Sequence, residues 1–218
     1  MENSKKRIAI CFWGQTRTFR TLEEVYNKLY DEEVEIDYFV STWDDFDNKE
    51  PFNNFTKKEF LNSDNYDLKN NTEKAFYLIN RVNKLKSDYE IENKFVYDYI
   101  LWTRNGILFD PKTLMPFLKE KATNHKDLEI ITHSDIRYEQ GVLRLDADYY
   151  FSGTSVAFDL YACGWKYYFK GKNSSSFQGI NGGHHAHAFI IKAFNFQHST
   201  FNLHHEFLFN KLKKREVC

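Results

Sequence analysis

The stretch VYDYILWTRNGILFD, from Val96 to Asp110, sets an arginine and a glycine between two apolar runs. Its aromatic and β-branched residues predict a buried strand, which turns polar at Thr103, Arg104 and Asn105. A buried guanidinium is costly unless an anion pairs with it. Polar turns at strand ends are also where α/β proteins bind ligands. The pattern therefore indicates an anion-binding turn at Arg104.

A second polar turn, GQTRTFR, follows a short apolar strand predicted from Arg7 to Phe12. A glycine turn that leads into a helix can bind phosphate through its backbone amides, and Arg17 adds a guanidinium. The spacing matches neither a GxGxxG fingerprint nor a P-loop. An ordinary solvated loop therefore explains this turn equally well.

A third turn, STWDDFD, ends the strand predicted from Glu35 to Trp43. Its aspartates Asp44, Asp45 and Asp47 could bind ribose hydroxyls, or a Mg²⁺ or Mn²⁺ ion, which both prefer oxygen ligands. Trp43 could stack on a base. The alternative is a solvated acidic loop.

The run NGGHHAHAF is the densest group of histidines in the chain. If it begins a helix, His184 and His187 face one way and His185 faces another, so the three cannot share one tetrahedral zinc site. One of them could serve as a general base or contact a sugar or a leaving phosphate, because imidazole titrates near neutral pH. Polar residues at a helix start are the alternative.

Lysines alternate with aromatic rings in WKYYFKGKNSSSF, from Trp165 to Phe177. Such a segment can stack bases and hold phosphates through Lys166, Lys170 and Lys172. The same alternation is typical of an edge strand protected by lysines. We expect a loop from Lys166 to Ser176.

Composition limits the classes of function. The chain has 218 residues, 42% of them hydrophobic, and a net charge of −1, so it has no general basic field for coating nucleic acid. No apolar run approaches the ~20 residues that span a bilayer, and the N-terminal apolar run is too short for a signal peptide. Three scattered cysteines fit reduced thiols. We expect a cytoplasmic protein.

The elements that must position these turns alternate along the chain. After the first strand, Thr21 caps a predicted helix, and the second strand then completes a βαβ unit. We expect a loop from Asn48 to Asn71 with a short helix at Lys57 to Leu61, and then a long helix from Thr72 to Tyr89. Further predicted elements are a helix from Pro111, a strand from Leu128 to Ser134, a helix at HHAHAFIIKAF and a closing helix from His205 to Lys213. Without repeats or linkers, residues 1–218 predict a single α/β domain.

Five segments of the chain are, in order, GQTRTF, YFVSTWD, AFYLINRVNKLKSDYE, YDYILWTRNGILF and DADYYFSGTSVAFDLY. Taken together, they resemble the family of small GT-A-type nucleotide-sugar glycosyltransferases of bacteria, phages and large viruses. The resemblance runs from Ile8 to about Asn195. It implies an α/β/α sandwich with a mostly parallel, Rossmann-like sheet, whose nucleotide-binding part is about 7–110 and whose acceptor-side part is about 111–218.

The resemblance also implies roles for individual residues. The nucleoside-diphosphate sugar, with a UDP-sugar as the first choice, would contact Gln15, Arg17, Thr18, Trp43, Asp44, Arg104, Asn105 and Gly106. Arg17 and Arg104 would face the diphosphate, and Trp43 and Asp44 the nucleoside. Asp148 would contact sugar hydroxyls or act as the base, and His184 or His185 would contact phosphate or acceptor. These three are the expected catalytic residues.

One position departs from the family pattern, which has an aspartate of the metal-binding motif where this chain has Gly106. Either Asp44, Asp45 and Asp148 hold a Mn²⁺ or Mg²⁺ ion, or arginine and histidine neutralise the diphosphate without metal, or the enzyme is inactive. The acceptor would be a glycan or a hydroxymethylated base of phage DNA, which Lys166, Lys170 and Lys172 would contact. A nucleotide-sugar-binding relative without activity and a single-strand nucleic-acid-binding module remain alternatives. The oligomeric state is left open.

Overall fold

A computed structural model describes residues 5–14, 26, 29–44, 54–68, 70–139, 142–145, 149–172, 183–203 and 205–207. Seven strands form the central sheet in the order β10-β6-β9-β4-β1-β2-β3. Their bounds are β1 Lys6–Trp13, β2 Val34–Trp43, β3 Lys57–Leu61, β4 Tyr99–Arg104, β6 Glu129–Thr132, β9 Tyr150–Gly153 and β10 Gln197–Thr200.

All strands of this sheet except β9 point the same way. The pairings of β1 with β2, β1 with β4, β2 with β3 and β6 with β10 are parallel, and β9 is antiparallel to both β4 and β6. The mostly parallel α/β sheet expected from the sequence is therefore confirmed.

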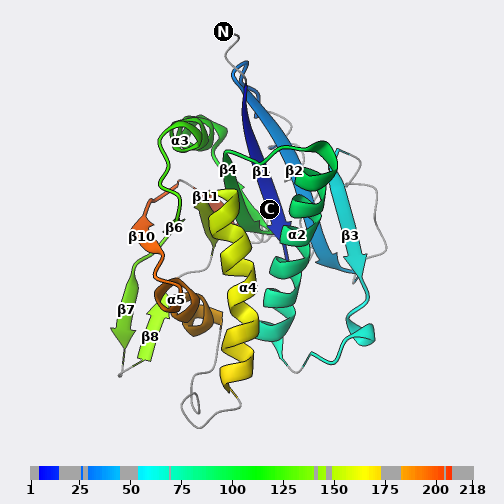
Figure 1. Ribbon diagram of the computed structural model, residues 1–218, viewed down its shortest axis with the longest axis vertical. Helices are drawn as coiled ribbons and strands as arrows, with labels where there is room; N and C mark the ends of the chain where they lie inside the picture. Colours follow the sequence, from blue (N-terminus) through cyan, green and yellow to red (C-terminus); the bar gives the residue numbers. More distant parts are fainter. Residues whose placement is uncertain are drawn as a thin grey trace, which may run out of the picture.

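Helices cover both faces of the sheet, which gives three layers (Figure 1). On one face lie α2 (Asn71–Asn93), α4 (Ser155–Lys172) and α5 (Gly183–Ala193). On the other lie α3 (Pro111–Thr123) and a small antiparallel sheet of β5 (Ile107–Phe109) and β11 (His205–Phe207). A 3₁₀ turn, η2 (Ser63–Asn65), precedes α2, and a hairpin of β7 (Ile136–Glu139) and β8 (Val142–Leu145) follows β6.

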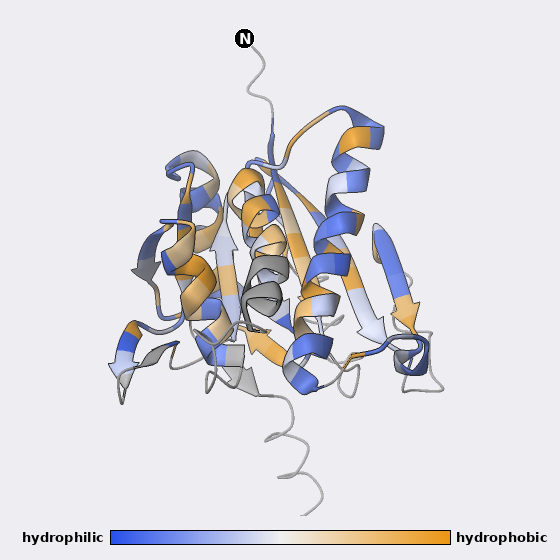
Figure 2. Ribbon diagram, turned by 60° about the horizontal axis from the view of Figure 1, so that its bottom comes forward, coloured by the Kyte–Doolittle hydropathy of each residue, from blue (hydrophilic) through white to orange (hydrophobic). Residues whose placement is uncertain are grey.

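The first strand shows why the sheet needs both layers. Ala9 and Cys11 pack into the core under α2 and α4, whereas Ile8, Ile10 and Phe12 pack into the core under α3. A parallel strand buried on both faces has a continuous apolar sequence in place of strict alternation. Figure 2 shows the result, with hydrophobic strands in the middle of the molecule and hydrophilic residues along the outer side of α2.

The helices α2 and α3 begin at side-chain caps that the sequence supplies. Asn70 accepts a hydrogen bond from the Glu73 amide at 3.0 Å and starts α2, and Asp110 accepts one from the Lys112 amide at 3.0 Å and starts α3. Pro111 follows at a position where helices tolerate proline. The long helix predicted from Thr72 and the helix predicted from Pro111 are both confirmed.

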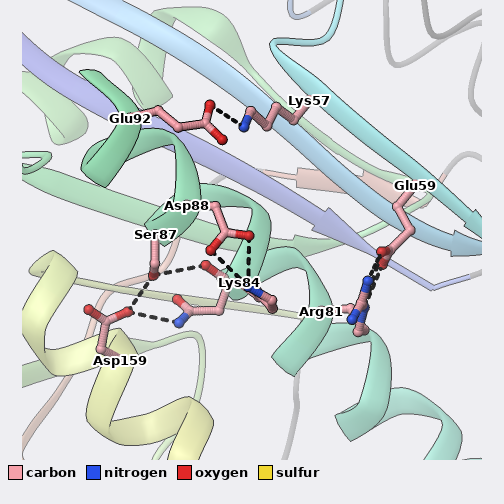
Figure 3. Close-up of polar contacts among 9 residues, drawn as sticks. Lys57, Glu59, Arg81, Lys84, Ser87, Asp88, Glu92 and Asp159 are labelled. Carbon is pink, nitrogen blue, oxygen red and sulfur yellow. Dashed lines mark hydrogen bonds and ion pairs between the residues drawn. The ribbon is translucent and has the colours of Figure 1, made fainter. Parts of the chain in front are cut away.

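Polar contacts fix α2 against its neighbours (Figure 3). On one side Lys57 contacts Glu92 at 2.5 Å, which ties the helix to β3. On the other side Ser87 and Asn83 donate hydrogen bonds to Asp159 of α4 at 2.9 and 2.8 Å. The helix is therefore held at two edges by side chains that the sheet and α4 supply.

Three predictions of local structure are wrong. The helix predicted at Lys57 to Leu61 is β3, because this segment pairs in parallel with β2. The helix predicted from His205 begins as β11, which pairs with β5; residues 208–213 lie outside the described part of the chain. The loop predicted from Lys166 is helical as far as Lys172, because α4 continues through it.

Within the described part of the chain, no helix has the length and apolar character needed to cross a membrane.

Candidate functional site

β1, β2 and β4, the strands that the predicted ligand turns follow, end at one edge of the sheet. Trp13 pairs with Arg104 on one side and with Ser41 on the other, so the three neighbouring parallel strands end together. We call the ends of these strands, with the residues that follow them, the carboxyl edge; it points downward in Figure 1. Carboxyl ends of parallel strands are the usual ligand site of α/β sheets.

Two side chains hold the backbone at the start of the first turn. The Gly14 carbonyl accepts hydrogen bonds from Thr42 Oγ1 at 2.6 Å and from Asn105 Nδ2 at 2.8 Å. Gly14 has a φ of 107°, which favours glycine. The backbone amide of Asn105 also donates a hydrogen bond to the Trp13 carbonyl at 2.8 Å. The chain therefore leaves β1 in a direction set by β2 and by the turn after β4. Gln15, Arg17 and Thr18 lie outside the described residues.

Arg104 lies exposed at the end of β4, where the strand turns polar, so its guanidinium does not carry the cost of burial. The guanidinium carbon is 5.6 Å from the centroid of the Trp13 ring, within the range of a cation–π contact. Trp13 is buried and Arg104 is exposed, so the indole ring contacts one side of the guanidinium while Arg104 stays exposed to solvent at the carboxyl edge. This placement suits an incoming anion without the cost of burying a charge.

Gly106 turns the chain from β4 into β5 with a φ of 95°. An aspartate at this position would carry a Cβ in a conformation that costs roughly 1–2 kcal/mol for an ordinary L-residue. The glycine therefore has a conformational role of its own in this turn.

The nucleoside contact predicted for Trp43 is not supported. Trp43 is only 5% exposed, and its ring stacks on Tyr77 of α2, with ring centroids 5.9 Å apart and planes at 14°. Packing between β2 and α2 occupies the face that a base would need. Burial of Tyr77, with the adjoining Tyr66 hydroxyl, raises the Tyr77 pKa to about 12, so its hydroxyl stays neutral at physiological pH.

Of the acidic residues that the sequence analysis expected to bind the ligand or a metal ion, Asp44 is the one that lies among the described residues. It is exposed at the end of β2, and its amide donates to the Leu61 carbonyl of β3 at 2.7 Å. Asp45 and Asp148 lie outside the described residues. Within the described ranges, no three acidic, histidine or cysteine side chains are grouped so that they could hold a metal ion.

The histidine run begins α5, as predicted, and its members have different surroundings. His184 Nδ1 donates to the Leu145 carbonyl at the end of β8 at 2.5 Å. His187 is buried, contacts the Tyr161 hydroxyl and lies between the rings of Phe76 and Phe151, whose centroids are 4.5 and 4.6 Å away. His187 is therefore a core residue, whereas His184 and His185 are half-buried.

Lys166, Lys170 and Lys172, which the sequence analysis expected to contact the acceptor, fall on the last turns of α4. Their side chains lie outside the described part of the structure. The helix replaces the flexible loop on which the stacking prediction depended.

Two residues of the carboxyl edge were not predicted. The Tyr149 carbonyl, at the entry to β9, accepts a hydrogen bond from the Arg104 amide at 3.3 Å. The Tyr149 ring lies 5.1 Å from the ring of His133, which follows β6. A signal for His133 was present, since it is a polar residue at the end of a predicted strand. None marked Tyr149, because its position depends on β9 running antiparallel between β4 and β6.

Neither a protein-family model nor a curated protein matches this chain. Among solved structures, it is similar to the crystal structure of a glycosyltransferase involved in the glycosylation of the major capsid of PBCV-1. The two share 9% identity at a TM-score of 0.44, and the match covers 89% of this chain and 82% of that chain. At this level the match carries no assignment of activity, which must come from the carboxyl edge.

Proposed function

We propose that this protein is a glycosyltransferase that moves a sugar from a nucleoside-diphosphate sugar to an acceptor hydroxyl. The observation that carries the proposal is Arg104, an exposed guanidinium at the carboxyl edge, beside the fixed start of the GQTRTFR turn. A diphosphate leaving group develops negative charge as the glycosidic bond breaks. Preorganised cations at that position lower the barrier. The ordered motifs that resemble GT-A enzymes favour this chemistry over other uses of a phosphate site.

Each polar residue of the carboxyl edge then has a role. Arg104, with Arg17 from the adjoining turn, binds the diphosphate, and Asp44 binds the nucleoside. Asp148 contacts sugar hydroxyls or takes the proton of the acceptor hydroxyl. His184 or His185, at the start of α5, contacts phosphate or acceptor. Asn105 positions the first turn through the Gly14 carbonyl and needs no contact with substrate.

The donor diphosphate must be neutralised without the family's aspartate at Gly106. A divalent cation would find oxygen ligands in Asp44, Asp45 and Asp148, and it would supply positive charge to the diphosphate. Otherwise arginine and histidine carry this role alone. With one anionic ligand missing, we propose that activity depends on metal less than in relatives that keep the aspartate, so EDTA should slow turnover only in part.

A second candidate function is binding of a nucleotide sugar without transfer. Gly106 favours it, because the motif that usually holds the metal is incomplete. The two candidates share the donor site and differ in turnover.

The test begins with thermal unfolding against UDP, GDP and other nucleoside diphosphates, each with and without Mn²⁺. A ligand at 100 times its Kd adds about 2.7 kcal/mol to the free energy of unfolding, so binding is easily detected. The nucleotide sugars that bind are then incubated with glycans and with oligonucleotides that carry hydroxymethylated bases, and the products are weighed. Binding with no transfer or hydrolysis supports the second candidate. No stabilisation by any nucleoside diphosphate would refute both.

A further inference from the structure

Two tyrosines, Tyr66 and Tyr77, lie next to the carboxyl edge where β2 and β3 end. Tyr66 follows β3 and the η2 turn, and Tyr77 lies in the second turn of α2, which begins at the same side of the sheet (Figure 1). The segment that leads to Tyr66 is attached to the end of β2, because the Asp44 amide donates to the Leu61 carbonyl at 2.7 Å. Both tyrosines are half-buried.

The rings of Tyr66, Tyr77 and Trp43 form one packed group. Between ring centroids, Tyr66 lies 4.7 Å from Tyr77 and 6.0 Å from Trp43. Its plane is tilted by 45° to the first ring and by 57° to the second, whereas Trp43 and Tyr77 stack on each other. Neither ring of the group therefore stacks on Tyr66, and a planar ligand at this edge meets Tyr66 before it meets the buried indole.

A salt bridge holds this group against the sheet. Arg81, one turn after Tyr77 in α2, has its Nε 3.1 Å from both carboxylate oxygens of Glu59 in β3 (Figure 3). Ser41 of β2 donates to the same carboxylate at 2.8 Å. The Tyr66 hydroxyl adjoins that of Tyr77. The position of the Tyr66 ring is thus set by α2, β2 and β3 together, which lowers the cost of ordering it when a ligand binds.

This group lies on the same face of the sheet as Arg104. Trp13 and Trp43 both pack into the core under α2. Arg104 pairs with Trp13 in the sheet and contacts its ring, so its side chain lies on the α2 face too. From β4 to β2 the sheet spans two strand spacings, ~10 Å. A nucleoside diphosphate whose phosphates contact Arg104 and whose nucleoside contacts Asp44 therefore brings its base to the ends of β2 and β3.

We propose that Tyr66 binds the nucleobase of the donor by stacking on it. This step rests on the proposed function, and it assigns to Tyr66 the contact that Trp43, being buried, does not make. Stacking on an aromatic ring tolerates every base, because each base has a flat π face. Tyr66 therefore makes affinity depend on the presence of a base and much less on which base it is.

The test is isothermal titration of the full chain with UDP, GDP and inorganic pyrophosphate. Tyr66→Ala should weaken binding of UDP and of GDP by about tenfold or more, because it removes the stacking contact with the base. Its affinity for pyrophosphate, which has no base, should be unchanged. Tyr66→Phe keeps the ring and should bind all three ligands like the unmodified chain. The matched control is Tyr30→Ala, which removes a 78% exposed tyrosine before β2 and should change none of the affinities.

Two results would overturn the role of Tyr66 while the donor site stands: UDP and GDP affinities of Tyr66→Ala equal to those of Tyr30→Ala, or nucleotide and pyrophosphate affinities that fall by the same factor. If neither UDP nor GDP binds the unmodified chain, the proposed function fails as well. Thermal unfolding shows whether Tyr66→Ala is folded. Tyr66→Leu, which fills more of the volume and has no π face, replaces it if it is not.

Discussion

At the scale of single residues, the carboxyl edge separates side chains that meet a ligand from side chains that hold the backbone in place. Arg104 faces solvent above a buried tryptophan, whereas Asn105, the next residue, turns inward to the Gly14 carbonyl. Adjacent residues of a strand end point to opposite sides, so one turn can supply both an anion contact and its support.

Arg104→Ala should weaken binding of a nucleoside diphosphate by about tenfold or more, because a charge-assisted hydrogen bond is worth ~1.5–3 kcal/mol. Isothermal titration with UDP or GDP measures the change. Arg104→Lys keeps the charge but loses the planar fork, so it should recover part of the affinity. Unchanged affinity of the alanine variant would remove Arg104 from the donor site.

At the scale of elements, α2 carries two lysine–carboxylate pairs with the same spacing and opposite surroundings. Lys86 is fully buried, 3.0 Å from both Glu90 and Asp159, and Ser155 also contacts its ammonium group at 2.5 Å. Lys84 pairs with Asp88 at 2.8 Å on the exposed side of the same helix. The buried ion pairs of Lys86 join α2 to α4. They also hold the segment that leads into β4, because Glu90 accepts a hydrogen bond from the Tyr97 backbone amide at 2.9 Å.

Lys86→Met should lower the free energy of unfolding by about 3–5 kcal/mol, since it leaves the Glu90 carboxylate buried without its cation. Lys84→Met, the same chemical change on the exposed side, should cost no more than about 0.5 kcal/mol. Urea denaturation of the two variants compares them. Equal decreases would mean that the buried pair adds no more to stability than a surface pair.

A second element, β10, gives the fold a dependence on pH. His198 lies 2.8 Å from Thr132 Oγ1 of β6, and the Thr132 hydroxyl donates to the Ser134 carbonyl, so the imidazole Nε2–H donates to threonine. Burial lowers the His198 pKa; Asp135 opposes the shift and Lys192 adds to it. The unfolded chain therefore binds the proton more readily than the folded chain.

The stabilisation by neutral His198 is complete above the ordinary histidine pKa of about 6.5 and is lost as the pH falls from there through the lowered value. Melting temperature should fall more steeply between about pH 7 and pH 5 in the unmodified chain than in His198→Gln. Differential scanning calorimetry of both proteins in the same buffers measures the difference. Parallel pH profiles would show that His198 does not titrate differently on folding.

At the scale of the whole molecule, the part expected to bind nucleotide and the part expected to bind acceptor share one sheet. β9 of the second part pairs with β4 of the first part, and β11 of the second part pairs with β5 of the first. Removing the second part would expose the long edge of β4. Neither part can therefore complete its core alone.

We expect the full chain to unfold in one transition. Tryptophan fluorescence, which reports Trp13, Trp43, Trp102 and Trp165, should give the same urea midpoint as far-ultraviolet circular dichroism. A fragment of residues 1–110 should not give a cooperative transition. Two separated midpoints, or a fragment that folds, would show that the parts are independent.

Local sequence determined the elements whose signals are complete within a short window. The apolar runs of β1, β2 and β4 and the polar turn after each strand follow from residue type and spacing, and together they predict ligand turns at a parallel sheet edge. Arg104 could be placed at that edge from sequence because a strand that becomes polar must end.

Only the tertiary structure decided the features that depend on residues far apart in the chain. Lys57–Leu61 is a strand because β2 offers it a partner, Trp43 is core because Tyr77 covers it, and Tyr149 reaches Arg104 because β9 runs antiparallel to β4. The pairing of Arg137 with Arg144 in the β7–β8 hairpin likewise depends on a register that the residues between them do not specify. Local propensity amounts to at most about 1 kcal/mol per residue, and long-range pairing and burial outweigh it.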